Sequence, residues 1–129
     1  MLIAYSKKKN GNQKLSKNFK VKEFACKDGS DVVFIDTVLV NLLQNIRNHF
    51  NKPVHINSGF RTYSYNKKIG GARYSQHQYG TAVDIYIDGI TPKEIADYAE
   101  TLMVGTGGIG IYNNFVHLDV RVEKSRWKG

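Results

Sequence analysis

Apolar residues recur with two different periods along this chain, and this combination restricts the fold more than any other feature. Between residues 36 and 50 they are spaced by three and four positions, which is typical of a helix with one buried face. Between residues 82 and 87, and again between 115 and 122, they alternate with other residues, which is typical of a strand. Helical and strand segments do not alternate strictly along the chain. The sequence therefore predicts an α+β fold.

Local signals predict where these elements begin and end. Asp36 is a suitable N-cap for the first helix, and Pro53 follows its expected end. Thr91 and Glu94 form a capping box around Pro92, which predicts the start of a second helix. The expected strands cover residues 54–57, 82–87, 109–112 and 115–122. We expect the last two to form an antiparallel pair that is joined through Asn113 and Asn114. Residues 62–76 are expected to form a loop with a helical turn.

The length and the charge distribution predict one domain with a basic arm. A chain of 129 residues is the size of a single domain, which we expect to cover residues 19–129. Residues 1–18 are polar and rich in lysine, and we expect an extended or poorly ordered arm. Of the net charge of +8, residues 1–28 carry +6, whereas residues 29–120 carry −1. The basic ends either attract an anionic polymer, such as a bacterial wall polymer, or only solubilise the protein.

Several classes of protein are excluded or disfavoured by what the sequence lacks. The one cysteine, Cys26, excludes an internal disulfide framework and a zinc site built from several cysteines. Any metal must therefore be held by histidines and carboxylates. No segment has the roughly 18–20 continuous apolar residues of a membrane-spanning helix. The first residues do not have the pattern of a secretory signal, so we expect synthesis in the cytoplasm.

Ionisable side chains share one face of two predicted strands. Because side chains alternate along a strand, Asp84 lies opposite the apolar face of its strand, and His117 and Asp119 share the corresponding face of theirs. His77 lies in the loop before Asp84, and Gly80 allows that loop to fold back. Two imidazoles and one carboxylate suit a zinc ion and leave a fourth position open. The alternatives are a surface His77, an Asp84 that caps a turn, and a His117 hydrogen-bonded within the sheet.

Four segments of the chain carry a recognisable pattern: residues 58–62, 75–84, 108–112 and 116–121. The most specific part is a Ser-x-His-x-x-Gly-x-Ala-x-Asp sequence over residues 75–84. Together the segments resemble the zinc D-alanyl-D-alanine carboxypeptidase family, whose members cut bacterial peptidoglycan peptides and include phage endolysins. The resemblance spans about residues 19–127. It implies the small α+β hedgehog/DD-peptidase fold, in which an antiparallel sheet carries the metal and helices pack behind it. Residues 19–129 would then be one zinc peptidase domain.

The resemblance also implies roles for individual residues. His77, Asp84 and His117 correspond to the ligands of one zinc ion. Arg61 corresponds to an arginine that anchors substrate, and a guanidinium is well suited to pair with a peptide carboxylate. Ser75 corresponds to a serine just ahead of the first ligand, where it either contacts substrate or caps the loop that holds His77.

One position departs from the family pattern. Many relatives have a Glu or Asp three residues before the last histidine as the general base, but this chain has Asn114 there. Asp119 is the nearest candidate, two residues after His117, and we expect it to be the catalytic acid–base residue. The alternatives for Asp119 are to orient a ligand imidazole or to form an ion pair with Arg121.

These observations predict a zinc-dependent peptidase that hydrolyses amide bonds in peptidoglycan stem peptides, as a carboxypeptidase or an endopeptidase. The first alternative is a non-catalytic, zinc-containing cell-wall-binding module, which Asn114 favours. The second is a nucleic-acid-binding domain, but the positive charge lies at the chain ends and no nucleic-acid motif is present, so we expect no specific nucleic acid. We expect a monomer that reaches the cell wall after phage-type lysis.

Overall fold

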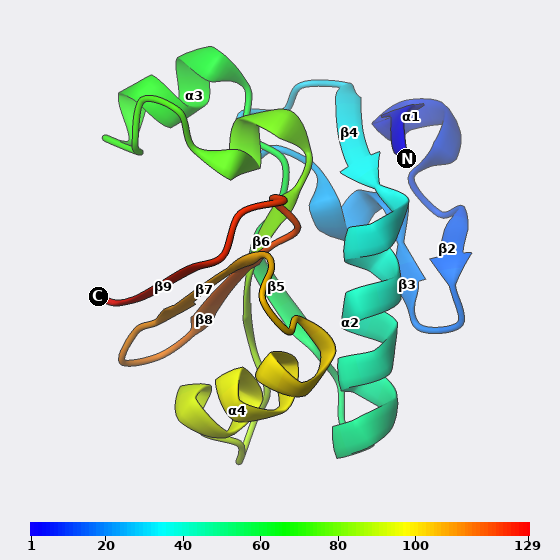
Figure 1. Cartoon of the computed structure of the whole chain (residues 1–129). Helices are drawn as coiled ribbons and strands as arrows, with labels where there is room; N and C mark the ends of the chain where they lie inside the picture. The colour runs from blue at the N-terminus through cyan, green and yellow to red at the C-terminus, as the bar shows by residue number, and fades with distance from the viewer.

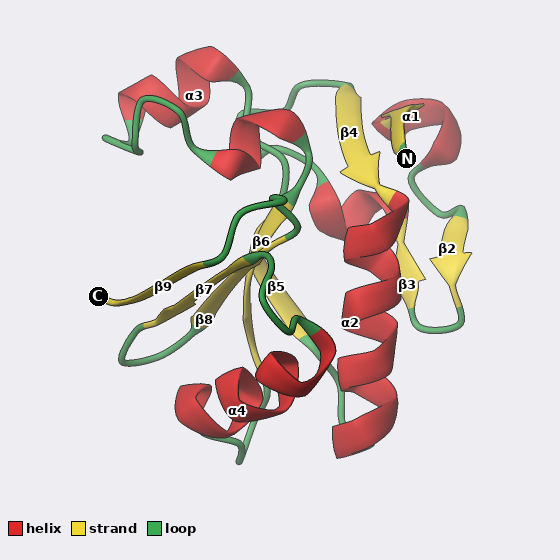
Figure 2. Ribbon diagram, viewed as in Figure 1, coloured by secondary structure: helices red, strands yellow, loops and turns green.

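The computed structural model describes residues 1–129 as nine strands, four α-helices and two 3-10 helices (Figures 1 and 2). The strands are β1 (Leu2–Ser6), β2 (Lys14–Ser16), β3 (Phe19–Lys20), β4 (Val32–Asp36), β5 (His55–Ser58), β6 (Ala82–Tyr86), β7 (Gly108–Ile111), β8 (Val116–Asp119) and β9 (Ser125–Lys128). The helices are α1 (Lys7–Asn10), α2 (Thr37–Phe50), α3 (Tyr63–Lys68) and α4 (Pro92–Leu102), with the 3-10 helices η1 (Val21–Phe24) and η2 (Gln76–Tyr79). None of the helices has the length and apolar character needed to span a bilayer.

The central sheet has five strands in the order β5-β6-β8-β7-β9. Every neighbouring pair is antiparallel except β7 and β9, which run parallel. There are two separate two-stranded sheets: β1-β4 lies at the N-terminal end of α2, and β2-β3 lies on the side of α2 away from the central sheet (Figure 2). This arrangement confirms the predicted α+β class and the antiparallel pair β7-β8.

The helix ends follow the predicted caps. The Asp36 side chain accepts a hydrogen bond from the backbone N–H of Val38 at 2.8 Å, and α2 ends at Asn51 in the left-handed conformation. At the start of α4, the Thr91 hydroxyl accepts from the backbone N–H of Glu94, and the Glu94 carboxylate accepts from the backbone N–H of Thr91. Both helices therefore begin where local sequence signals place them.

The core lies between these two helices and one face of the central sheet. Val83, Ile85 and Leu118 point from β6 and β8 into it and are fully buried. Leu43 and Ile46 from α2 meet them and are also fully buried. Burial of each such side chain contributes roughly 1.5–3 kcal/mol. The opposite face of the same strands is left for polar residues, as the alternation predicts.

Residues 1–18, where the sequence predicts an extended or poorly ordered arm, contain β1, α1 and β2. Strand β1 pairs antiparallel with β4, and Ile3 lies opposite Ile35. Asp31 fixes the short helix α1, because its carboxylate accepts hydrogen bonds from the Ser6 hydroxyl at 2.7 Å and from the Lys8 backbone N–H at 2.8 Å. The partners lie about 30 residues away in the chain, and a lysine-rich local composition gives no sign of such pairing.

Candidate metal centre and adjoining cleft

The metal-binding candidates lie in one row of residues across the central sheet. The strand register places Ser58 opposite Asp84, and Asp84 opposite His117. The row continues from His117 to Gly110 and from Gly110 to Trp127. Because residues directly opposite each other in a sheet point to the same face, this row brings five residues from five strands onto the polar face.

His77 reaches the same place from η2, which precedes β6. Its ring Nε2 lies 3.3 Å from Asp84 Oδ1, and its Nδ1 donates to the backbone carbonyl of Gly59 at 2.8 Å. The turn after η2 is closed by Gly80 in the left-handed conformation (φ 73°), which confirms that the loop folds back there. The carbonyl of Gly59 selects the tautomer in which Nε2 is free to act as a ligand.

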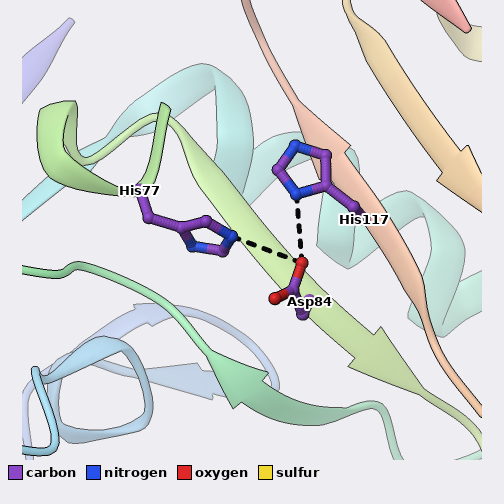
Figure 3. A group of neighbouring side chains, drawn as sticks. All are labelled: His77, Asp84 and His117. Carbon is purple, nitrogen blue, oxygen red and sulfur yellow. Dashed lines mark hydrogen bonds and ion pairs between the residues drawn. The ribbon is translucent and has the colours of Figure 1, made fainter. Parts of the chain in front are cut away.

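His117 is held in the complementary way. Its Nδ1 lies 3.0 Å from Asp84 Oδ1, and its Nε2 donates to Asp119 Oδ2 at 2.7 Å. Figure 3 shows both imidazoles directed at the carboxylate of Asp84. One donor atom from each of the three residues lies within 4.8 Å of the other two.

The donor set fits a zinc ion. Two neutral imidazole nitrogens and one carboxylate oxygen are typical zinc ligands, and each imidazole is oriented through its other nitrogen, as metal-bound histidines are. All three residues are buried yet line a cleft of about 420 Å³. The structure thus brings together the three residues that the sequence singled out, and their chemistry suits one metal ion with access from the cleft.

The charges in this group stabilise one another. Burial acts to raise the pKa of Asp84, but its contacts with His117 and His77 outweigh burial and hold that pKa well below its ordinary value. Burial acts to lower the pKa of His117, but Asp119 and Asp84 together raise it above its ordinary value. Asp84 is therefore a carboxylate throughout the neutral range.

Asp119, the predicted general base, lies next to His117 but not in the lining of the cleft. Its side chain is completely buried, and it does not line the cleft. Its two oxygens accept hydrogen bonds from the backbone N–H of Gly108, from the backbone N–H, Nε and Nη2 of Arg121, and from His117 Nε2. These contacts also hold the pKa of Asp119 below its ordinary value against the opposing effect of burial. The geometry fits the two alternatives together: Asp119 orients His117 and pairs with Arg121.

The position of Asn114 offers no substitute for a base. Asn114 is exposed in the hairpin between β7 and β8, and it does not line the cleft. Asp84 is the one carboxylate residue among those that line the cleft.

Arg61 lies beside the metal candidates, as expected for a substrate anchor. Its Nε donates to the Ser58 hydroxyl at 3.0 Å, its Nη1 to Asn66 Oδ1 at 3.2 Å and its Nη2 to Asp84 Oδ2 at 3.4 Å. A guanidinium has five N–H groups, so these contacts leave one on each terminal nitrogen. Asn66, on α3, is almost completely buried, and the sequence analysis missed its role as a support for Arg61.

Ser75 caps the helix that carries His77. Its hydroxyl accepts a hydrogen bond from the backbone N–H of His77 at 3.3 Å, and the residue also lines the cleft. Ser75 therefore caps η2, and it also lines the cleft in which a substrate would bind.

Trp127 is a site residue that the sequence analysis did not identify. The centroids of its ring and the His117 ring are 5.1 Å apart, and its Nε1 donates to the Tyr112 hydroxyl at 2.9 Å. The Arg121 guanidinium lies over the same indole at 5.6 Å. The ring crosses β7 at Gly110, where a Cβ atom would collide with it. Parallel pairing of β9 with β7 has no local turn signal, so nothing in the sequence pointed to this position.

A family model described as Peptidase M15 matches residues 17–119. The chain belongs to the peptidase M15 family. This confirms the resemblance on which the ligand assignment drew, and the zinc that the family implies agrees with the His-Asp-His group.

The similar curated proteins are peptidases according to their names, and one of them is named as a peptidoglycan endopeptidase. The Peptidoglycan L,D-endopeptidase MepK of Escherichia coli (strain K12) is 39% identical over 75 residues, which cover 53% of this chain and 40% of that protein. The same protein of Shigella flexneri matches equally. The Zinc D-Ala-D-Ala carboxypeptidase of Streptomyces albus G is 47% identical over 34 residues, which cover 26% of this chain and 13% of that protein. The match thus spans less than half the length of these relatives.

Proposed function

We propose that this protein is a zinc-dependent peptidase that hydrolyses amide bonds in bacterial peptidoglycan stem peptides. The observation that carries the proposal is the convergence of His77, Asp84 and His117 within 4.8 Å in the wall of a cleft that Arg61 also lines. The peptidoglycan enzymes named among its relatives support the substrate class. We also propose that the sheet and its two covering helices are of the hedgehog/DD-peptidase type.

In this proposal, His77, Asp84 and His117 hold the ion. When bound, zinc supplies Lewis acidity that activates water and polarises a peptide carbonyl. The chain's part is to keep both imidazoles correctly turned, through Gly59 and Asp119, before substrate arrives. We infer that Asp119 acts on the reaction through His117, as a positioning residue.

Arg61 binds the substrate carboxylate in this proposal. Its guanidinium is held by Ser58, Asn66 and Asp84, so little side-chain freedom is lost when substrate binds. The two N–H groups left on its terminal nitrogens suit a carboxylate of the stem peptide. The Ser75 hydroxyl, at the same cleft, contacts the peptide backbone in addition to capping η2.

The test compares zinc content and muropeptide cleavage in the wild type and in the variants His77→Ala, Asp84→Ala and His117→Ala. We expect one zinc per chain in the wild type and loss of both zinc and cleavage in each variant. The control is His55→Ala, because His55 stacks on Tyr86 outside the cleft. If the three variants keep zinc and cleavage, the proposal is wrong. A mass-spectrometric map of the products distinguishes carboxypeptidase from endopeptidase action.

The second candidate function is a zinc-containing cell-wall-binding module without turnover. It is favoured by one observation: Asp84, itself a ligand candidate, is the one carboxylate residue that lines the cleft. The expected result for such a module is stoichiometric zinc and binding to purified peptidoglycan, with no release of new amino groups. Release of amino groups above the level of the His117→Ala variant excludes it.

We further propose that the cationic N-terminal part favours approach to anionic wall polymers. Residues 1–28 carry a net charge of +6 and include β1, α1, β2, β3 and η1. Of these, α1, β2 and β3 lie on the far side of α2 from β9 (Figure 1). The attraction is electrostatic, so sedimentation with purified walls is expected to weaken as salt is added. Binding that does not change with salt would contradict it.

A further inference from the structure

A second hollow, of about 440 Å³, adjoins the cleft that holds the metal candidates. Arg61 and Tyr74 line both, so the two spaces lie side by side at these residues. The further lining of the second hollow comes from Phe60, from Tyr63 at the start of α3, and from the segment 73–79. No part of the function proposed above uses this space.

The hollow collects the exposed aromatic side chains of the molecule. Of the eight tyrosines, Tyr63, Tyr74 and Tyr79 are the exposed ones, at 68%, 71% and 45%, and all three line it. Exposed aromatic rings gathered in one place are characteristic of binding surfaces, because rings without a binding role are normally packed. We call this group the tyrosine hollow.

The polar groups of the tyrosine hollow are arranged around these rings. The Arg73 guanidinium lies 5.4 Å from the centroid of the Tyr74 ring. The side-chain amide of Gln78 donates to the backbone carbonyl of Arg73 at 3.0 Å, which ties the two ends of this loop together. Two arginines and no acidic residue line the space. The matching ligand is neutral or anionic, with an apolar face for the rings and polar edges for the arginines and the amide.

The pyranose ring of an N-acetylated amino sugar has this chemistry. Its C–H groups form an apolar face that packs on an aromatic ring, and its hydroxyl and acetamido groups project at the edges. The alanine and glutamate residues of a stem peptide offer no comparable surface, because their side chains are small or charged. Within peptidoglycan, the sugar is therefore the component that fits the tyrosine hollow.

We propose that the tyrosine hollow binds a sugar of the glycan strand while the adjoining cleft holds the attached stem peptide. This inference rests on the proposed function, since it takes peptidoglycan as the substrate. It makes Tyr63 and Tyr79 specificity-determining residues that favour glycan-linked peptides over free peptides. Tyr74 and Arg61 lie where the two parts of the substrate meet.

The test uses the double variant Tyr63→Ala/Tyr79→Ala and two substrates, a disaccharide-linked stem peptide and the same peptide without sugar. For the linked substrate we expect KM to rise about tenfold with kcat unchanged. For the free peptide we expect no change. The double variant Tyr63→Phe/Tyr79→Phe keeps the rings and is expected to behave like the wild type. Tyr86→Ala, which removes a tyrosine outside both spaces, is the matched control.

A binding measurement separates this inference from the peptidase proposal. Peptide-free glycan strands, titrated against the zinc-loaded protein and followed by NMR, are expected to bind the wild type and to lose binding in the double alanine variant. That result supports the sugar site even if the protein cleaves neither substrate. The inference is overturned if both proteins bind the strands equally. It is also overturned if the free peptide loses as much activity as the linked one, since the hollow would then hold peptide.

Discussion

At the level of single residues, the geometry of the candidate site is set by the hydrogen bonds that His77 and His117 make with partners other than Asp84. The carbonyl of Gly59 and the carboxylate of Asp119 each accept one ring N–H, and so the remaining ring nitrogens of His77 and His117 face a common point. Asp119 can hold this position because it is completely buried and is itself fixed by Arg121. A carboxylate in this setting is suited to orient His117, and its side chain is not part of the cleft lining.

The variant Asp119→Asn tests this role. It keeps the size of the side chain but removes the charge that stabilises His117, so we expect zinc affinity to fall by about tenfold to a hundredfold. Competition with a chromophoric chelator measures this affinity. At saturating zinc we expect substantial cleavage to remain. Wild-type zinc affinity with no cleavage would instead identify Asp119 as the general base.

Trp127 provides an optical test of the same site. It is the chain's single tryptophan, and its ring lies beside that of His117. We expect zinc to change the intrinsic fluorescence of the wild type in proportion to its binding, because the neighbouring imidazole changes from a free ring to a ligand. The same titration of His117→Ala is expected to give a flat signal. An unchanged emission in a wild-type protein shown to contain zinc would contradict the placement of Trp127.

At the scale of elements, β9 is attached to the domain by Arg126. Its guanidinium pairs with the carboxylate of Glu100 on α4 and donates to the backbone carbonyls of Met103, Thr106 and Gly107. These carbonyls follow the end of α4, where backbone acceptors lack helical partners. The Arg126 side chain therefore joins β9 to α4. Trp127 lies on the same strand, so this attachment also helps to position its ring.

Removal of this attachment is expected to destabilise the fold. For Arg126→Ala we expect the free energy of unfolding in urea to fall by about 2 kcal/mol, because several carbonyls and one carboxylate lose a charged donor. Lys128→Ala, an exposed position on the same strand, is the control and should change stability little. Equal stability of the two variants would show that Arg126 does not hold β9 in place.

The Glu100–Arg126 pair also predicts a pH dependence. The hydrogen bond from Arg126 lowers the pKa of Glu100 below its ordinary value of 4.5. A lowered pKa in the folded state contributes stability above the unfolded-state pKa, and this contribution is lost as the pH falls. The difference in Tm between the wild type and Glu100→Gln is therefore expected to be constant at neutral pH and to shrink below about pH 4.5. A difference that grows on acidification would contradict this assignment.

At the scale of the whole molecule, the metal candidates connect segments that are far apart in the chain. His77 comes from η2, Asp84 from β6 and His117 from β8. An ion bound to all three links the loop above the sheet to its central strands, and a ligand that binds the folded state alone stabilises it.

Zinc removal is therefore expected to lower Tm. At a free zinc concentration about a thousandfold above its Kd, the stabilisation is about 4 kcal/mol. Calorimetry with zinc and with a chelator measures the shift in the wild type, and His55→Ala is expected to show the same shift. His117→Ala is expected to have one Tm under both conditions. A chelator shift in His117→Ala as large as that of the wild type would place the ion elsewhere.

Much of this molecule was predictable because its signals are local. The caps at Asp36 and Thr91 are read from a few neighbouring residues, and the structure has both. Strand alternation was sufficient to place Asp84 and His117 on one face, and the register then brings them side by side. The Ser-x-His-x-x-Gly-x-Ala-x-Asp pattern, which ends at Asp84, also identified His77 as a candidate ligand. His77 reaches Asp84 because the chain turns once, at Gly80, between the two residues.

The α+β class, the two main helices and the His-Asp-His group were predictable from the chain alone, because helix caps, residue periodicity and a short motif are properties of neighbouring residues. The pairing of β1 with β4, the place of Trp127 and the burial of Asp119 were visible only in the folded chain. Each of these depends on contacts between distant segments. Asp119 shows the physical reason: on a bare strand it faces the same way as His117, and its burial under Arg121 is what closes it to the cleft.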